Sequence, residues 1–305
     1  MSKPMPTEEG ILAFLEKCDA FYPPDAVNAS IGQQREWYNA LCREFSPPYP
    51  AGLVAGDALV DDCVPVRRYR PVRIATPAQL LYLHGGGFVV GSLDSHDSIC
   101  AEIADAVGAE LTAVDYRLAP EEVWPAQHDD CYAVLRSLVD QGHKVVVVGD
   151  SAGGNLAAGL CVRAAREGWS GSILGQVLIY PALGGDLETG SYDEMGEAPG
   201  LSTSDVRYYR EVLKAPADDP VAYPLLLDDV ATLPPAYITA AHFDPLRDDG
   251  RHYATRLAEA GVEVWFREEP QMVHAWLRAR HMSEGARAGF AALCRAVTHF
   301  ALSGN

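Results

Sequence analysis

One short stretch limits the fold of this chain more than any other: residues 145–155 read VVVVGDSAGGN. A run of valines stops at a glycine-flanked serine and passes at once into an alanine-rich helical pattern. This predicts a strand, a sharp turn and a helix with Ser151 at the apex. Such a turn holds its central residue in strained geometry that only small neighbours tolerate, and Gly149 and Gly153 stand two positions to either side. It also places the amide of Ala152 at a helix N-terminus, where the dipole favours a developing negative charge.

The remainder of the chain alternates short β-rich runs with longer helical patterns. This rhythm predicts a mostly parallel sheet with helices on both faces. With 305 residues, 48% of them hydrophobic, the chain can fill a sizeable core, and we favour one large domain. The expected strands are 80–83, 110–114, 145–148, 176–179, 236–240 and 262–266.

Two regions break this rhythm. Residues 1–45 are helical before any expected strand, and residues 184–219 are rich in Gly, Asp, Glu and aromatics where another strand–helix unit is expected. We therefore predict a helical cap from these two segments over a catalytic core of residues 46–183 and 220–305. The candidates for its pocket side, each of which could equally be packing the cap onto the core, are Tyr192, Met195, Leu201, Tyr208 and Tyr209.

A glycine-rich loop precedes the serine turn. The expected strand 80–83 runs directly into His84 and then Gly85, Gly86 and Gly87. Successive glycines leave backbone amides free to point at a bound anion, and a loop here supplies the remaining oxyanion donors in an α/β-hydrolase sheet. A phosphate loop is disfavoured because neither glycine–lysine nor dinucleotide-binding spacing is present. A plain turn remains the alternative, and His84 is interpreted as a residue that orients the loop.

A serine nucleophile needs a base to remove its proton and a carboxylate to orient that base. In α/β-hydrolases the chain order is serine, acid, histidine, with the last two on loops after later strands. Asp244 follows the expected strand 236–240, and His274 follows 262–266. These two residues are the predicted acid and base for Ser151.

Other residues compete for both roles. His281 is the main rival for the base, but it comes seven residues after His274, where the chain is expected to have left the strand edge. Asp248 is expected to support the acid's loop by hydrogen bonding. Asp150, beside the nucleophile, is expected to point away from the base on so tight a turn.

Composition excludes several classes of partner. The net charge of −18 and the pI near 4.8 disfavour nucleic acid and anionic membranes, which require clustered Lys and Arg. Near the start, residues 11–15 form only a short apolar patch, so we expect no signal peptide and no membrane anchor. The seven cysteines are scattered without metal-binding spacing, which predicts reduced thiols, no metal site and a cytoplasmic protein.

The motifs together resemble the bacterial hormone-sensitive-lipase-like esterases. They are HGGGF at 84–88, YRLAPE at 116–121, GDSAGGN at 149–155, DPLRDDG at 244–250 and His274. The resemblance implies an α/β-hydrolase fold with an eight-stranded, mostly parallel sheet, helices on both faces and a helical cap. It implies hydrolysis of short-chain acyl esters through an acyl-enzyme without a cofactor, acting on a small-molecule substrate. It also implies a homodimer paired through the last strand.

Carried over residue by residue, the resemblance makes Ser151 the nucleophile, His274 the base and Asp244 the acid. The implied oxyanion donors are the amides of Gly86, Gly87 and Ala152, with Gly85 as a substitute for one of the first two.

Three positions depart from the family pattern. Ala275 and Trp276 stand where the family usually has glycine and phenylalanine, and Asp249 replaces a glutamate. None of these changes removes a catalytic group.

Two other functions stay open. An amidase, such as an aryl-formamidase, would use the same three residues. A catalytically silent ligand-binding protein is disfavoured because His274 is present. The physiological ester is not specified by the sequence.

Overall fold

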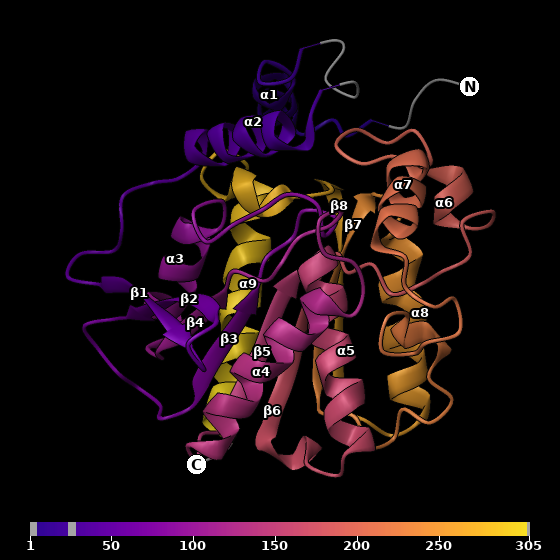
Figure 1. Ribbon diagram of the computed structural model, residues 1–305. Helices are drawn as coiled ribbons and strands as arrows, with labels where there is room; N and C mark the ends of the chain where they lie inside the picture. Colours follow the sequence, from indigo (N-terminus) through magenta and orange to yellow (C-terminus); the bar gives the residue numbers. More distant parts are fainter. Residues whose placement is uncertain (1–4, 24–28, 304–305) are drawn as a thin grey trace.

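The fold is built on one eight-stranded sheet (Figure 1). The structure is a computed structural model that describes residues 5–23 and 29–303; the parts of the predicted cap at 1–4 and 24–28 lie outside the described residues. The strands are β1 (Val54–Val60), β2 (Val64–Arg70), β3 (Gln79–Leu83), β4 (Leu111–Val114), β5 (Val145–Asp150), β6 (Ile173–Ile179), β7 (Ala236–Phe243) and β8 (Val264–Val273). Their order is β1-β2-β4-β3-β5-β6-β7-β8, antiparallel at β1/β2 and β2/β4 and parallel elsewhere. The predicted fold class is confirmed.

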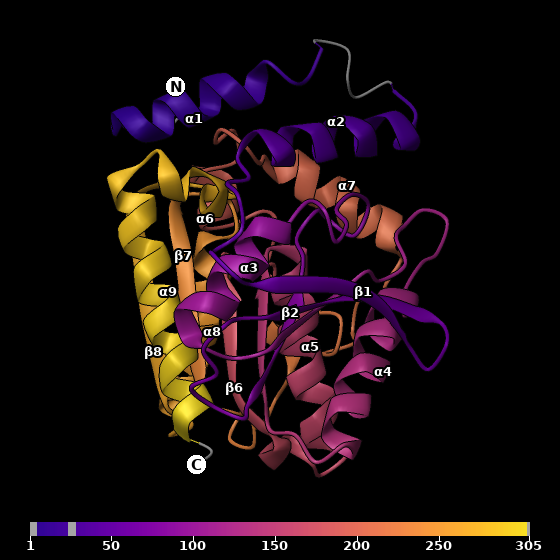
Figure 2. The ribbon, with the colours of Figure 1, turned by 90° about the vertical axis from the view of Figure 1, so that its left-hand side faces the viewer.

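Helices cover both faces of this sheet, as Figure 2 shows. One face packs against α3 (Asp97–Val107) and α9 (Glu284–Ser303), and the other against α4 (Ala126–Asp140), α5 (Ala152–Arg166) and α8 (Arg247–Glu259). Parallel strands buried on both faces need nearly continuous apolar sequence, which is why the runs in β3, β5 and β6 were legible.

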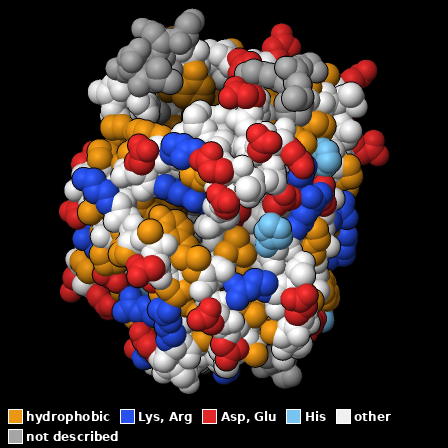
Figure 3. Space-filling view, turned by 90° about the vertical axis from the view of Figure 1, so that its right-hand side faces the viewer, with side chains coloured by type: hydrophobic (Ala, Val, Ile, Leu, Met, Phe, Trp, Pro, Cys, Tyr) orange, Lys and Arg blue, Asp and Glu red, His pale blue; other side chains and the backbone are white. Residues whose placement is uncertain are grey.

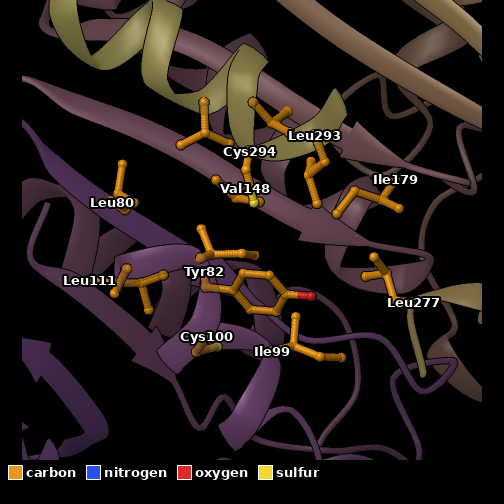
Figure 4. Packing of buried hydrophobic residues seen from close by; sticks show 14 of the residues in the cluster. Leu80, Tyr82, Ile99, Cys100, Leu111, Val148, Ile179, Leu277, Leu293 and Cys294 are labelled. Carbon is orange, nitrogen blue, oxygen red and sulfur yellow. The ribbon is translucent and has the colours of Figure 1, made fainter. Parts of the chain in front are cut away.

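Close packing between the sheet and the α3/α9 layer is visible in Figure 4. Side chains of β3, β5 and β6 meet side chains of α3 and α9, and each is at most 8% exposed. At about 25 cal/mol per Å² of apolar surface, each fully buried Leu or Ile here stabilises the fold by roughly 2 kcal/mol. Figure 4 labels Leu80, Tyr82, Val148 and Ile179 of these strands, Ile99, Cys100, Leu293 and Cys294 of these helices, and also Leu111 of β4 and Leu277 of η4 (Trp276–His281).

A set of helices lies over the carboxyl edge of the sheet, with α1 and α2 uppermost in Figures 1 and 2. They are α1 (Glu9–Asp19), α2 (Ile31–Glu44), the short α6 (Ser191–Glu194) and α7 (Thr203–Leu213). Ser202 and Asp205 form a capping box at the start of α7. Within residues 5–23 and 29–303 the helical turns are η2 (Ser170–Ser172), η3 (Pro224–Leu226) and η4 (Trp276–His281), the last of which contacts α1.

The surface carries charged side chains of both signs. On the face in Figure 3, Lys and Arg side chains are interspersed with Asp and Glu, and no broad basic patch is visible there. Within the described part of the chain, none of the helices has the length and apolar character needed to cross a membrane.

Candidate active site

The serine turn is tightly packed. Ser151 has φ 56° and ψ −117°, a strained conformation between β5 and α5. A Cβ added to Gly149 would lie 2.2 Å from the Gly153 carbonyl oxygen, and one added to Gly153 would lie 1.9 Å from the Leu83 carbonyl oxygen. The Ser151 amide donates to the Ile179 carbonyl at 2.9 Å. Both glycines are therefore sterically required, and the turn is tied to the neighbouring strand.

The structure brings the three predicted catalytic residues together. His274 Nε2 lies 2.8 Å from Ser151 Oγ, and His274 Nδ1 lies 2.7 Å from Asp244 Oδ2. Asp244 is fully buried and His274 is 8% exposed. The other carboxylate oxygen of Asp244 accepts the Leu246 amide at 2.8 Å, which fixes the carboxylate. This arrangement can draw the hydroxyl proton onto the imidazole and hold the resulting cation.

The residues around His274 include the departures from the family pattern. Ala275 has φ 63°, the left-handed region that favours glycine, so alanine there costs about 1 kcal/mol. Trp276 is fully buried, with its ring 6.0 Å from that of Tyr180. The Tyr180 ring lies 4.8 Å from the imidazole of His274. The bulkier tryptophan therefore supports the wall behind the base and does not enter the cavity described below.

The rival base and acid lie elsewhere. His281 is 52% exposed and contacts Glu102, with Nε2 3.1 Å from Oε2. Asp248 accepts the Ser191 amide at 2.9 Å and pairs with Arg251. Neither residue contacts Ser151 or His274.

The sequence analysis expects Asp150 only to point away from the base. In the structure, this residue also binds the start of the glycine loop. It is 2% exposed, and its Oδ1 accepts the Tyr82 hydroxyl at 2.8 Å and the Gly85 amide at 3.0 Å. Burial alone would raise the pKa of this carboxyl, but His96 and then Arg278 outweigh burial and hold the pKa well below its usual range. Asp150 is thus an anion that secures the start of the glycine loop.

This bond corrects one prediction. The Gly85 amide is already occupied by Asp150, so Gly85 is not available as a substitute oxyanion donor. Sequence reasoning missed this because the two residues are 65 positions apart.

Three other amides remain free at the site. Those of Gly86, Gly87 and Ala152 donate to no acceptor among residues 5–23 and 29–303, and all three residues line the same cavity as Ser151. Gly86 has φ 129°, and a Cβ there would lie 2.1 Å from the Val90 carbonyl oxygen. Positions 86 and 87 therefore admit only glycine, and both lie on the wall of the cavity beside Ser151.

The cavity has a volume of about 560 Å³. Of the predicted pocket residues, Leu201 and Tyr209 line it, whereas Tyr192 is buried with its hydroxyl on Asp249. The lining does not include Met195 or Tyr208. Sequence reasoning missed a further group of lining residues, whose only signal was aromatic or basic character in the α1, α2, η3 and η4 regions: Phe14, Tyr22, Tyr38, Tyr223 and Arg278.

Asp249, which replaces the usual glutamate, is buried and accepts several hydrogen bonds. It is 1% exposed and accepts the Leu183 amide at 2.6 Å, the Gly184 amide at 3.1 Å and the Tyr192 hydroxyl at 3.1 Å. Burial raises the pKa of its carboxyl. Asp249 thus joins α8 to the loop after β6.

The described residues contain no cluster of three or more His, Cys, Asp or Glu side chains that could hold a metal ion.

A protein family and several characterised proteins are similar to this chain in sequence. Residues 80–278 match a family described as alpha/beta hydrolase fold. An ethyl acetate hydrolase of Pseudomonas putida is 36% identical over 273 residues, which cover 81% of this chain and 86% of that protein. Carboxylesterase NlhH of Mycobacterium tuberculosis is 38% identical over 265 residues, covering 80% and 81%.

Solved structures of esterases have the same fold as this chain. An ester-hydrolase from the metagenome of Lake Arreo, complexed with a bipyridine phosphonate derivative, superposes with a TM-score of 0.87 at 31% identity, covering 97% of this chain and 99% of that one. Because a family match spans most of the chain and relatives above 30% identity span four fifths of it, the chain belongs to the α/β-hydrolase family, among the bacterial carboxylesterases that resemble hormone-sensitive lipase.

Proposed function

We propose that the protein is a serine carboxylesterase that hydrolyses short-chain acyl esters through Ser151, His274 and Asp244. One observation carries this proposal: a continuous hydrogen-bonded chain of 2.8 and 2.7 Å runs from the serine hydroxyl through the imidazole to a buried carboxylate, at the wall of a cavity. The relatives named above are esterases that match most of this chain.

Two half-reactions make up the mechanism. His274 Nε2 takes the hydroxyl proton as Ser151 Oγ attacks the ester carbonyl, and the protonated imidazole then gives that proton to the leaving alcohol. Water attacks the resulting acyl-enzyme with the same base, and the acid leaves as Ser151 recovers its proton. Asp244 holds the ring in the required tautomer and stabilises its charged form.

The amides of Gly86, Gly87 and Ala152 form the oxyanion hole in this proposal. Their lack of protein acceptors and their place on the cavity wall support it. Fixed donors of this kind lower the barrier without reorganising during the reaction, and loss of one costs about 10²- to 10³-fold in kcat.

The segments 1–45 and 184–219 act as a cap in this proposal. Lining residues of α1, α2 and α7, among them Phe14, Tyr38 and Tyr209, support it because they bound the cavity opposite the serine. The cap would set the size of the acyl and alcohol groups.

The proposal also includes a cytoplasmic location and a homodimer. A cytoplasmic protein fits seven free cysteines. A homodimer paired through the last strand fits the position of β8 at the edge of the sheet, where Trp265 and Phe266 are 38% and 40% exposed. Light scattering at two protein concentrations tests the dimer.

A series of p-nitrophenyl esters from acetate to laurate tests the activity, with and without a serine-directed phosphonate. Turnover greatest at short chains and a phosphonate adduct located on Ser151 by mass spectrometry are the expected results. Absence of both turnover and label would overturn the esterase proposal. Faster cleavage of a matched anilide would instead favour an amidase.

A further inference from the structure

The same cavity contains a buried positive charge that the esterase mechanism does not use. Arg278 lies on η4, four residues after His274, and is 5% exposed. Its Nε donates to Cys42 Sγ at 3.3 Å and its Nη2 to the Tyr38 hydroxyl at 2.5 Å. Burial raises the pKa of both the Cys42 thiol and the Tyr38 phenol, so neither partner is an anion at neutral pH.

Other buried arginines differ in this respect. Among the described residues, Arg247 and Arg280 are as deeply buried as Arg278. Arg247 pairs with Glu194 at 2.5 Å, and Arg280 pairs with Glu102 at 2.6 Å. Arg278 pairs with no carboxylate of the described chain. A buried guanidinium without an anion in contact is costly unless a ligand supplies one.

Part of this guanidinium remains free. Nη1 makes no hydrogen bond to any residue of the described ranges. Nη1 is not fully enclosed by protein atoms. The open space that Arg278 lines is the cavity. Arg278 therefore has two N–H groups without an acceptor in the described part of the chain, and it lines the same cavity as Ser151.

The surrounding charges leave room for an anion. Asp150 balances Arg278 from a distance, but its Oδ1 is already engaged by Tyr82 and Gly85. Asp19 and Asp205 also line the cavity, but both are exposed, so water screens their repulsion of an anion.

We propose that Arg278 is a specificity-determining residue that binds a carboxylate on the substrate, so that the enzyme prefers esters carrying a second, ionised carboxyl group. The proposal rests on the esterase activity proposed above and names its substrate class. Guanidinium and carboxylate match in geometry, and a hydrogen bond between charged groups is about twice as strong as a neutral one.

Matched esters provide the test. Monoethyl succinate, glutarate and adipate place the carboxylate on the acyl side, and 4-acetoxybutanoate places it on the alcohol side. Ethyl levulinate replaces the carboxylate of the succinate ester with a neutral carbonyl, and ethyl pentanoate removes the acceptor. Hydrolysis is followed by proton NMR. We expect kcat/KM for one of the two carboxylate series to exceed that of its neutral counterpart by about 10- to 100-fold.

Two substitutions locate the preference. Arg278→Met should reduce the ratio of kcat/KM for carboxylate over neutral esters by about 10- to 100-fold, mainly through KM, and Arg278→Lys should retain part of it. Arg166→Met removes the same charge from an exposed position on α5 and should leave the ratio unchanged. Circular dichroism checks folding. If Arg278→Met does not fold, the wild-type ratio and competitive inhibition by free glutarate still decide the matter.

Several outcomes overturn the proposal. Equal rates on carboxylate and neutral esters would do so, as would equal rates on levulinate and the succinate monoester, which would indicate a neutral acceptor. An equal loss on both classes in Arg278→Met would indicate a structural role only. Failure of the esterase proposal is distinct, because then no ester turns over and Ser151 takes no phosphonate label.

Discussion

Two sides of the cavity are built differently. Its floor is the catalytic side, with Asp150, Asp244 and His274, and its roof is formed by the cap helices α1 and α7. On the floor, Asp150, Asp244 and His274 are at most 8% exposed, and each makes hydrogen bonds through its side chain. On the roof, α1 and α7 leave large side chains in water, such as Leu12 at 40% and Tyr208 at 41% exposed. Rigid, buried groups hold reacting atoms in place, whereas a partly exposed layer tolerates change. We therefore expect the floor to set the rate and the roof to set the size of the acyl and alcohol groups that the cavity accepts.

Removal of the nucleophile should produce the largest difference between the two regions. Ser151→Ala is expected to lower kcat by about 10⁴-fold or more, because the remaining groups cannot form an acyl-enzyme. Ser204→Ala, at an exposed serine of α7, should leave activity within about 3-fold, as is usual for a surface site. Steady-state rates on p-nitrophenyl acetate measure both. Full activity in Ser151→Ala would show that another group is the nucleophile.

Loss of a buried charge should weaken the floor. Asp150→Asn keeps the shape of the side chain but removes the buried charge that accepts from Tyr82 and Gly85 and balances Arg278 from a distance, so we expect the free energy of unfolding to fall by about 2 kcal/mol. The exposed Asp140, paired only with Arg136, provides the control, and Asp140→Asn should change stability by less than about 0.5 kcal/mol. Urea titration measures both. Equal effects of the two substitutions would contradict the role given to Asp150.

Acid should also act on the core and not on the roof, since neither 1–45 nor 184–219 contains a histidine. Burial lowers the pKa of His128 to about 4. The unfolded chain takes up this proton near pH ~6.5, so it binds more protons than the native state between these values. The free energy of unfolding should fall as pH drops from about 6.5 to 4, by up to roughly 3 kcal/mol from this residue.

Urea midpoints between pH 7.5 and 4.5 measure this effect. His128→Leu should reduce the pH dependence, because no proton is then taken up at this position on unfolding. His84 and His96 should retain the rest of the slope, since burial lowers the pKa of these two side chains as well. His252→Leu, at an exposed position of α8, should retain the wild-type slope. An unchanged slope in His128→Leu would rule out this source of acid sensitivity.

A change in the roof should have the smallest effect on rate. The ring of Tyr209 lies so close to Gly87 that a Cβ on that glycine would be 2.4 Å from it. Tyr209→Ala should open space above the oxyanion loop and shift the preferred acyl chain toward longer esters. One methylene in a pocket is worth about 1 to 3 kcal/mol, so changes of about 10-fold per substrate are expected. The profile from acetate to laurate measures the shift, and an unchanged profile would place the size limit elsewhere.

The sequence by itself determined the six parallel strands of the sheet, the serine turn, the glycine loop and the loops that carry Asp244 and His274. Each of these depends on a local pattern: a buried strand leaves an apolar run, and the turn after it needs glycine or a polar residue at a fixed offset. It did not indicate β1, because this edge strand, with Val54 67% exposed and Leu59 56% exposed, has no steady alternation of buried residues. It also did not indicate β2, because Pro65 and three arginines interrupt the apolar residues of that strand. The sequence also did not indicate the start of α8 at Arg247, because the first turn of this helix is polar.

Only the tertiary structure decided which groups meet in the cavity. It brought Arg278 to Tyr38 across 240 residues and the Gly85 amide to Asp150 across 65, and it selected Leu201 and Tyr209 from five cap candidates. Strand ends at one edge of a parallel sheet meet wherever the sheet forms, so catalytic residues there can be predicted from their place in the chain. The side chains that a docked helix directs into a cavity depend on how it packs, and no periodicity within the helix records that.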